Sequence, residues 1–357
     1  MTMSTEPINA SRLKKISTDP VATAKAAKLI YTKETEEGIR RVRKGKGFTY
    51  TYRNKTIKSQ SQLNRIRSLV LPPAWEDVWI CVSPNGHLQA TGKDKMGRKQ
   101  YRYHSQWSEV RGKTKFYRLL ELGKLLPAIR KQVAKDIALP GLPKNKVLAA
   151  VIMLIEKTGI RIGSGIYEKL YGSFGITTLK DKHVTVRAGQ LKFSFRGKKG
   201  VQHCVTLKNK KLAHIVSECR DIPGQELFQY INEEGKREVI ESGMVNNYIK
   251  EIAEAEFTAK DLRTWCGTVT ALEALQAAGA FETATEGKQK IVAVLDKVSE
   301  QLGNTRTVCK KYYVHPGILE LYENGKLEGF VTKKQFSSSH NGLNKDEQLL
   351  IHLLKKI

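Results

Sequence analysis

The stretch NTRTVCKKYYVHPG, residues Asn304–Gly317, limits the possible fold of this chain more than any other part of the sequence. Two tyrosines, Tyr312 and Tyr313, follow two lysines and precede Val-His-Pro, which predicts that a helix ends there. A phenol has a pKa of about 10, and nearby cations favour the phenolate, which is the better nucleophile. A lone tyrosine pair beside lysines is usually only the half-buried face of a helix, so the interpretation depends on the rest of the chain.

Three other basic motifs lie upstream. They are TGIRIGS (Thr158–Ser164), FRGKKGVQH (Phe195–His203) and AKDLRTW (Ala259–Trp265). With the four motifs in this order and spacing, the sequence resembles the type IB DNA topoisomerases, of the compact kind found in poxviruses and some bacteria. The resemblance extends from about Gly38 to Tyr322, and the combination is far more specific than any single motif.

The net charge indicates a polyanionic partner. Lysine and arginine total 62 against 35 aspartates and glutamates, which gives a net charge of +27 and a pI of about 9.8. Such an imbalance opposes compaction unless a polyanion binds, so we expect double-stranded DNA as partner. An anionic membrane is the alternative polyanion, but no apolar run approaches the roughly 20 residues of a spanning helix. The N-terminus also lacks a signal-peptide apolar region, so we expect a soluble, cytoplasmic protein. The resemblance adds the expectation of a monomer that is associated with the nucleoid.

The cysteine and histidine patterns predict chemistry without a bound metal or nucleotide, hence no cofactor. The five cysteines are scattered and contain no C-x-x-C pair, which indicates a reducing compartment. No zinc-ligand spacing, no H-E-x-x-H motif and no Walker-type G-x-x-x-x-G-K-[ST] motif occurs.

We expect an α+β fold of the tyrosine recombinase and type IB topoisomerase kind, with a small N-terminal sheet domain and a mainly helical catalytic domain that carries a small sheet and hairpin. Phe48, Tyr50 and Tyr52 alternate with polar residues, as in a half-exposed strand, and Asn85-Gly86 predicts a hairpin turn. The expected parts are an N-terminal extension, the sheet domain, the catalytic domain, and a C-terminal linker with an amphipathic helix, at residues 1–37, 38–110, 111–325 and 326–357.

A capping residue and two prolines predict where the first helices begin and where one of them is kinked or interrupted. Asp19 can cap a helix whose first position is Pro20. The resemblance implies a two-lobed clamp around DNA, and the basic joint at Arg111–Lys115 would be its hinge. The helix that follows is expected to be kinked or interrupted at Pro127.

The catalytic part is expected to contain strands and then helices. Alternation over VTVRAGQLKFSFRGKKGVQHCVTL predicts strands with turns at Ala188–Gln190 and Arg196–Gly200. Helical periodicity then dominates from Lys210 to Leu302, with interruptions at Gly267 and near Gly279. Gly303 should end the last of these helices and place Asn304 just beyond it.

A groove-reading strand is predicted at RKQYRYH, where Tyr101 and Tyr103 share one face and Gln100 lies on the other. Interleaved aromatic and basic side chains suit contact with base edges and phosphates, although a solvated edge strand has the same pattern. In the family, a Gln-Tyr-x-Tyr segment at this point contacts the DNA major groove, and Gln100, Tyr101 and Tyr103 match it.

Breaking a phosphodiester without a metal requires charge stabilisation at the phosphate oxygens and a proton for the leaving oxygen. In the family pattern the first arginine lies in an Arg-x-Gly-[Asn/Ser] turn after a buried helix, which here gives Arg161. The second lies at the Lys-Asp-Leu-Arg helix start, which gives Arg263. Two guanidinium groups at the scissile phosphate would donate hydrogen bonds to its oxygens and stabilise the negative charge that develops there.

The family's general acid is a lysine in a Gly-Lys turn at a hairpin tip. FRGKKGV places Lys198 there, with Lys199 as the competing candidate. An ammonium on a hairpin tip could protonate the departing 5′ oxygen.

The fifth catalytic position departs from the common pattern, because most of the family has His where this chain has Asn304. Asparagine can donate a neutral hydrogen bond to a phosphate oxygen but cannot carry a proton. We interpret His315 as a structural residue of the helix end and not as a replacement for the histidine that most of the family has at the position of Asn304. Tyr312 is the alternative nucleophile, but the spacing from Asn304 favours Tyr313.

The function implied is relaxation of supercoiled DNA without metal or ATP. One strand would be cleaved through a 3′-phosphotyrosyl intermediate on Tyr313, would rotate and would be rejoined. A tyrosine recombinase or integrase is one alternative, although this chain has Lys260 where those enzymes commonly have His. The other is a basic DNA-binding protein without catalytic activity.

Overall fold

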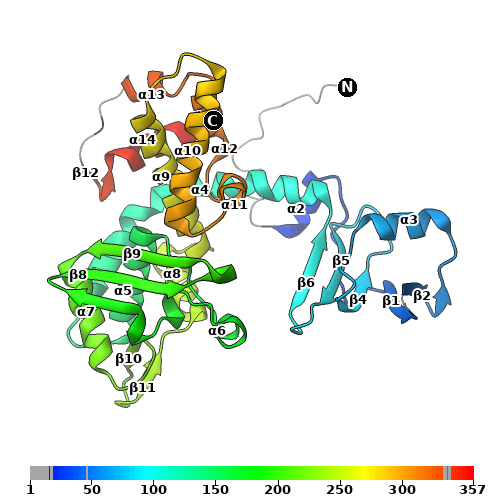
Figure 1. Ribbon diagram of the computed structural model, residues 1–357, viewed down its shortest axis with the longest axis horizontal. Coiled ribbons are helices and arrows are strands. Elements are labelled where there is room, and N and C mark those ends of the chain that lie inside the picture. Colours follow the sequence, from blue (N-terminus) through cyan, green and yellow to red (C-terminus); the bar gives the residue numbers. More distant parts are fainter. Residues whose placement is uncertain (1–15, 17–18, 46, 333–335, 337–338) are drawn as a thin grey trace. The chain divides into compact units, whose positions relative to one another are not determined.

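The computed structural model of the protein describes residue 16 and residues 19–45, 47–332, 336 and 339–357. Its chain divides into two compact units, Met1–Arg118 and Leu119–Ile357 (Figure 1). Part of the predicted N-terminal extension and part of the predicted C-terminal linker lie outside the described residues. The predicted boundaries of the four parts remain predictions.

The first unit is built on one antiparallel six-stranded sheet, in the order β3-β2-β1-β4-β5-β6. One helix packs on it through Ile66, which joins Ile39, Val78, Ile80 and Ala90 in a small buried core. The elements are α2 (Pro20–Ala26), β1 (Ile39–Lys44), β2 (Gly47–Tyr52), β3 (Lys55–Thr56), α3 (Gln60–Ser68), β4 (Glu76–Ile80), β5 (Leu88–Lys93) and β6 (Lys99–Tyr103).

Three local predictions for this unit are confirmed. The Asp19 side chain accepts a hydrogen bond from the backbone N–H of Val21 at 2.8 Å and so caps α2, with Pro20 at its first position. The Asn85-Gly86 turn joins β4 and β5, which pair in antiparallel fashion. The aromatic alternation over residues 48–52 forms β2, which pairs with β1.

A single helix, α4 (Ser105–Ile137), contains the basic joint at Arg111–Lys115, and the boundary between the two units falls inside this helix. The helix also continues through Pro127, so it is not interrupted there, and the alternative, a kink at Pro127, stays a prediction. A proline removes one backbone hydrogen bond, and the flanking leucines, lysines and arginines all favour helix. Leu122, Leu126 and Ile129, which follow helical spacing, are fully buried.

The second unit surrounds α5, whose residues from Val147 to Ile152 are almost completely buried. A helix buried on most faces fits its density of Val, Leu and Ile. The helices of this unit are α5 (Lys144–Thr158), α6 (Gly165–Tyr171), α7 (Lys210–Asp221), α8 (Ser242–Ala253), α9 (Ala259–Ala278), α10 (Ala284–Leu302), α11 (Arg306–Tyr312), α12 (Pro316–Glu323), α13 (Glu328–Thr332) and α14 (Lys345–Leu354).

A three-stranded antiparallel sheet packs against α5 and α7, as Figure 1 shows. Its order is β7-β8-β9, with both turns at the predicted positions. Phe193 and Phe195 point into the core while Lys192 and Ser194 are exposed, which confirms the alternation expected of a half-buried strand. The strands are β7 (Val184–Arg187), β8 (Gln190–Arg196) and β9 (Gln202–Lys208).

Helices dominate the segment from Lys210 to Leu302 as expected, but it contains one hairpin that was not predicted and lacks one predicted break. A hairpin of β10 (Gln229–Ile231) and β11 (Arg237–Val239) interrupts the helices, because Asn232 accepts hydrogen bonds from the backbone N–H groups of Glu234 and Lys236 and closes a turn. Gly267 does not break α9, which continues to Ala278. The predicted ends at Gly279 and Gly303 are confirmed.

The C-terminal helix α14 belongs to the core of this unit. Leu349, Leu350 and Leu353 are almost fully buried within it. A two-stranded pair that was not predicted, β12 (Ser339–His340) and β13 (Leu343–Asn344), precedes α14. In the described part of the chain, no helix combines the length and apolar composition needed to cross a membrane.

Candidate active site

The site begins where α10 ends. Gly303 adopts φ 58°, a left-handed conformation that glycine accepts without strain, and reverses the chain. Asn304 follows, and the Thr305 side chain accepts from the backbone N–H of Val308 at 3.4 Å to start α11. Tyr313 is the C-cap residue of this short helix. The quoted stretch therefore forms a turn, one helix and a second turn, with Asn304 and Tyr313 at opposite ends of the helix.

Arg161 reaches this turn from the end of α5. The helix ends at Gly159, with φ 64°, and the chain then carries Arg161 toward Gly303. One guanidinium nitrogen, Nη2, donates to the carbonyl oxygen of Gly303 at 3.1 Å and also to the side-chain oxygen of Asn304. Burial and the neighbouring Arg263 lower the pKa of Arg161 to about 10, so this cation remains charged at neutral pH.

Arg263, in the second turn of α9, is only 3% exposed. Its Nη2 donates to the carbonyl oxygen of Leu302 at 3.1 Å, and its guanidinium carbon lies 5.2 Å from the centre of the Tyr313 ring. Burial lowers its pKa, and the phenol of Tyr313 opposes that shift. A buried cation without a carboxylate partner is costly, which indicates that an anion completes the site.

The backbone of Tyr313 is held against α9. The Thr268 hydroxyl lies 3.1 Å from the carbonyl oxygen of Tyr313 and accepts from the backbone N–H of His315 at 3.3 Å. A Cβ atom on Gly267 would lie 2.9 Å from the same carbonyl oxygen, so only glycine allows this close approach. The glycine that looked like a helix break in the sequence is thus the point where the candidate nucleophile contacts the helix of Arg263.

Four buried donor atoms of this cluster have no hydrogen-bond partner among the described residues. They are Nη1 of Arg161, Nε and Nη1 of Arg263, and Nδ2 of Asn304. Buried donors are normally paired, so a cluster of unpaired donors on two cations and an amide is suited to binding an anion. In the described part of the chain, no group of three or more His, Cys, Asp or Glu side chains is arranged to hold a metal ion.

Lys198 lies on the tip between β8 and β9, in the short 3₁₀ turn Lys198–Gly200, and is exposed. Its ammonium lies 6.0 Å from the centre of the Tyr167 ring on α6. The neighbouring Lys199 has φ 62°, a strained conformation that tightens the turn. The structure thus brings Arg161, Arg263, Asn304 and Tyr313 together, whereas in the described residues no hydrogen bond or ring contact joins either lysine of the tip to that cluster.

His203 is a residue of the site that sequence reasoning missed. It is 4% exposed on β9 and stacks on Phe195, with ring centres 4.9 Å apart and planes 2° from parallel. Burial, Arg161 and Arg263 lower its pKa to about 4, so the ring is neutral at pH 7. From the sequence alone, a lone histidine in a strand is interpreted as a core residue. The one signal for a role at the site was its position five residues after Lys198.

Tyr312, the alternative nucleophile, and His315 have surroundings that differ from those of Tyr313. Tyr312 is 43% exposed, and the ammonium of Lys311 is 5.4 Å from the centre of its ring. His315 is the N-cap of α12, where its Nδ1 accepts from the backbone N–H of Gly317 at 3.1 Å. Burial lowers the pKa of His315 to about 4. These contacts agree with the structural interpretation of His315.

In the first unit, Tyr101 and Tyr103 lie on β6, at the edge of the sheet. They are 49% and 41% exposed and stack with ring centres 6.0 Å apart. Tyr103 also lies 6.2 Å from the ring of the buried Trp107. The Gln100 amide donates to Asp94 at 2.9 Å. The two tyrosines thus form a preordered aromatic face on an edge strand.

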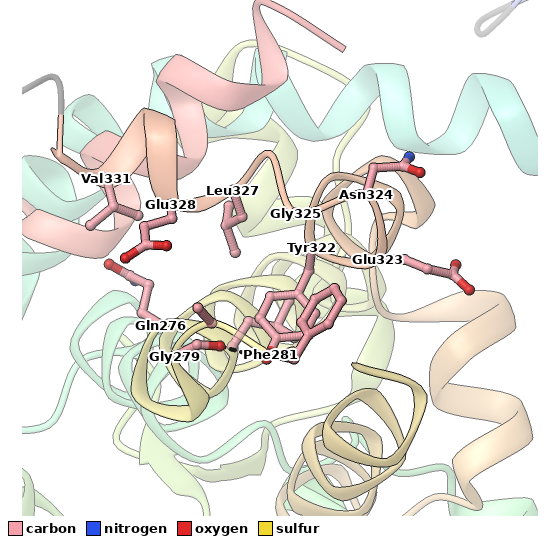
Figure 2. Close-up of a pocket in the computed structure, with 12 residues that line it drawn as sticks. Gln276, Gly279, Phe281, Tyr322, Glu323, Asn324, Gly325, Leu327, Glu328 and Val331 are labelled. Carbon is pink, nitrogen blue, oxygen red and sulfur yellow. Dashed lines mark hydrogen bonds between the residues drawn. The ribbon is translucent and has the colours of Figure 1, made fainter. Parts of the chain in front are cut away.

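A separate cavity of about 490 Å³ lies where the end of α9 meets α12 and α13. Figure 2 shows Tyr322 and Phe281 packed at its wall, with the Tyr322 hydroxyl donating to the carbonyl oxygen of Gly279 at 2.7 Å. Gln276 and Glu328 supply polar groups on the other side. None of the predicted site residues lines this cavity, so it is distinct from the arginine and tyrosine cluster.

Comparisons with known proteins agree with the motif reading. Residues 104–337 match the family described as eukaryotic DNA topoisomerase I, catalytic core, and residues 47–94 match the bacterial DNA topoisomerase IB N-terminal domain. DNA topoisomerase 1B of Acanthamoeba polyphaga mimivirus is 33% identical over 310 residues, which cover 85% of this chain and 92% of the relative. DNA topoisomerase 1B of Vaccinia virus (strain Copenhagen) is 25% identical over 270 residues, which cover 75% and 81%. DNA topoisomerase I of Monkeypox virus has the same identity and coverage.

A partial structural likeness, with a TM-score of 0.35 and 18% identity, joins 54% of this chain to 49% of the XerH site-specific recombinase bound to its difH substrate. The family assignment depends instead on the catalytic-core match, which spans most of the chain and includes all four basic motifs, and on the extent of the mimivirus relative. On these grounds the chain belongs to the type IB DNA topoisomerases.

Proposed function

We propose that this enzyme relaxes supercoiled DNA, without metal or ATP, by cleaving one strand through a 3′-phosphotyrosyl bond to Tyr313 and rejoining it after rotation. The observation that carries this proposal is the set of four buried, unpaired donors on Arg161, Arg263 and Asn304, beside the ring of Tyr313. A scissile phosphate bound there would satisfy donors that otherwise cost stability. The family membership supports the same reaction.

In the cleavage step, the Tyr313 oxygen attacks the phosphorus and the bond from phosphorus to the 5′ oxygen breaks. The phenol proton passes to water, and the leaving 5′ oxygen takes a proton from Lys198. Arg161, Arg263 and Asn304 donate to the non-bridging oxygens, where negative charge grows in the transition state. The neutral amide of Asn304 contributes a hydrogen bond without adding a third charge.

Rejoining is the same step in reverse. The phosphotyrosyl bond keeps the energy of the broken phosphodiester, so the 5′ hydroxyl can attack it without an external nucleotide. The free 5′ end rotates while the 3′ end stays bound to Tyr313, and this rotation removes supercoils.

DNA binding is proposed to extend beyond the reacting phosphate. The net charge of +27 supports sequence-independent binding to the phosphate backbone. Gln100, Tyr101 and Tyr103 are proposed to contact the major groove, supported by the exposed aromatic pair on the edge strand. We further propose that the enzyme acts as a cytoplasmic, nucleoid-associated monomer.

A plasmid-relaxation assay tests this function. With EDTA present and no ATP, the enzyme should convert supercoiled plasmid to a ladder of relaxed topoisomers. Loss of relaxation in EDTA, with recovery on adding Mg²⁺, would contradict metal independence. Binding without any change of topology would leave only a DNA-binding protein, and strand exchange between two duplexes without relaxation would indicate a recombinase.

A further inference from the structure

The hairpin of β8 and β9 carries Lys198 on a closed tip. The backbone N–H of Gly197 donates to the carbonyl oxygen of Val201 at 2.7 Å, and that of Gly200 donates to the carbonyl oxygen of Gly197 at 3.1 Å. These two bonds close the tip on itself and fix its internal shape. The position of Lys198 therefore depends on what holds the base of the tip.

His203 holds that base. A Cβ atom placed on Gly197 would lie 2.6 Å from Cδ2 of the His203 ring and 2.7 Å from its Nε2, so the ring is in direct contact with the glycine that precedes Lys198. The ring has little freedom to turn, because it is 4% exposed and stacks on Phe195, its cross-strand partner.

The same ring edge contacts the anion-binding cluster. A Cβ atom on Gly303 would overlap Cε1 and Nε2 of His203. Gly303 carries the carbonyl oxygen that Arg161 binds, and Asn304 comes next in the chain. The imidazole is thus wedged between two glycines, one at the base of the tip and one beside the two donors.

We propose that His203 is a positioning residue for DNA cleavage, whose ring sets the distance between the tip that carries Lys198 and the turn that carries Asn304. The inference rests on the proposed function. Arg161 and Arg263 keep their own bonds to Gly303 and Leu302 without the ring. Loss of the ring should therefore impair delivery of the proton by Lys198 more than binding of the phosphate.

A duplex with sulfur in place of the bridging 5′ oxygen measures proton delivery separately, because a thiolate leaves without a proton. We expect His203→Ala to slow single-turnover adduct formation on the ordinary duplex by on the order of tenfold or more, part of the 10²–10⁴ that a positioned acid contributes. On the sulfur duplex the variant should be within about threefold of the parent, and DNA affinity should be unchanged. His203→Phe, which keeps a flat ring, should retain most of the rate on the ordinary duplex.

His183→Ala is the matched control. His183 is also buried, and its ring lies 6.4 Å from the same Phe195 ring, but neither Gly197 nor Gly303 contacts it. It should lose thermal stability much as His203→Ala does, yet show the same ratio of rates on the two duplexes as the parent. Thermal melts of both variants identify any effect that comes only from unfolding.

Gly197→Ala tests the contact itself. The backbone of Gly197, with φ −91°, accepts alanine, so the only obstacle to the new methyl group is the His203 ring. We expect Gly197→Ala to form the adduct slowly on the ordinary duplex. The double variant with both His203→Ala and Gly197→Ala should be no slower than His203→Ala alone, because the methyl group enters the space of the missing ring.

Equal defects of His203→Ala on both duplexes, or independent effects of the two substitutions, would overturn the inference. A parent enzyme that forms no adduct on either duplex would overturn the proposed function instead, so the two failures can be told apart.

Discussion

Arg263 is buried and Arg161 is partly buried, both donate to backbone carbonyl oxygens, and no carboxylate pairs with either among the described residues. An arrangement that is costly in the free protein becomes favourable once a phosphate enters. We expect Arg161→Ala and Arg263→Ala each to slow cleavage by on the order of 10² or more, the usual loss for one preorganised donor. Single-turnover adduct formation is the measurement. A variant within a few-fold of the parent would remove that arginine from the site.

The buried His203 ring also predicts how stability depends on pH. Its pKa in the folded protein is about 4, below the usual value of about 6.5, so the unfolded chain binds a proton that the folded chain does not. Its contribution is therefore fully present above pH 6.5 and is lost as pH falls toward 4. As the pH falls from 7.5 to 4.5, the free energy of unfolding in urea should decrease for the parent. For His203→Phe this decrease should be about 2 kcal/mol smaller. Identical pH dependence in both proteins would contradict the shifted pKa.

At the scale of elements, alternation and end signals predicted the small sheet, its two turns and the end of α10 at Gly303. The motifs also identified the four side chains that the structure brings together. Gly267 and the β10–β11 hairpin were misread for different reasons. Strands of three residues are too short to show a detectable alternation of apolar and polar residues. The role of Gly267 depends on its contact with Tyr313, which no local sequence pattern contains.

Strand β6 carries a prediction at the same scale. Tyr101→Ala together with Tyr103→Ala should flatten the pattern of cleavage sites along a long duplex, because site preference requires side chains that reach base edges. The salt dependence of binding should change little, since no charge is removed. Adducts of both proteins mapped on one labelled duplex at two salt concentrations provide the comparison. An unchanged ladder would mean that the strand is only a solvated edge.

At the scale of the whole molecule, the C-terminal helix completes the second unit. Glu347, 5% exposed on α14, accepts from Arg130 on α4 at 2.7 and 2.8 Å and from the Trp265 indole on α9 at 3.0 Å. Burial alone would raise the pKa of Glu347, but Arg130 and Trp265 hold it below its usual value. Trp265 lies two residues from Arg263, so α14 supports the helix that carries that arginine.

Glu347→Ala should destabilise the protein by about 1.5–3 kcal/mol, because the partly buried Arg130 loses a charged hydrogen-bond partner and keeps only Glu156 as a carboxylate partner. The free energy of unfolding in urea is the measurement, and Glu320→Ala on the exposed face of α12 is the control. A loss below about 1 kcal/mol would show that α14 is dispensable. The sequence revealed the apolar face of α14 but not this network, since its members come from three separate helices.

The central claim is that Tyr313 is the nucleophile, and the trapped adduct tests it most directly. A nicked duplex whose short 5′-hydroxyl strand diffuses away after cleavage holds the enzyme on the 3′ end, and fragmentation of the digested peptide locates the nucleotide. The account predicts a 3′ phosphate on Tyr313 and no adduct in Tyr313→Phe, which should still bind DNA. A nucleotide on Tyr312, or an adduct that survives in Tyr313→Phe, would contradict it.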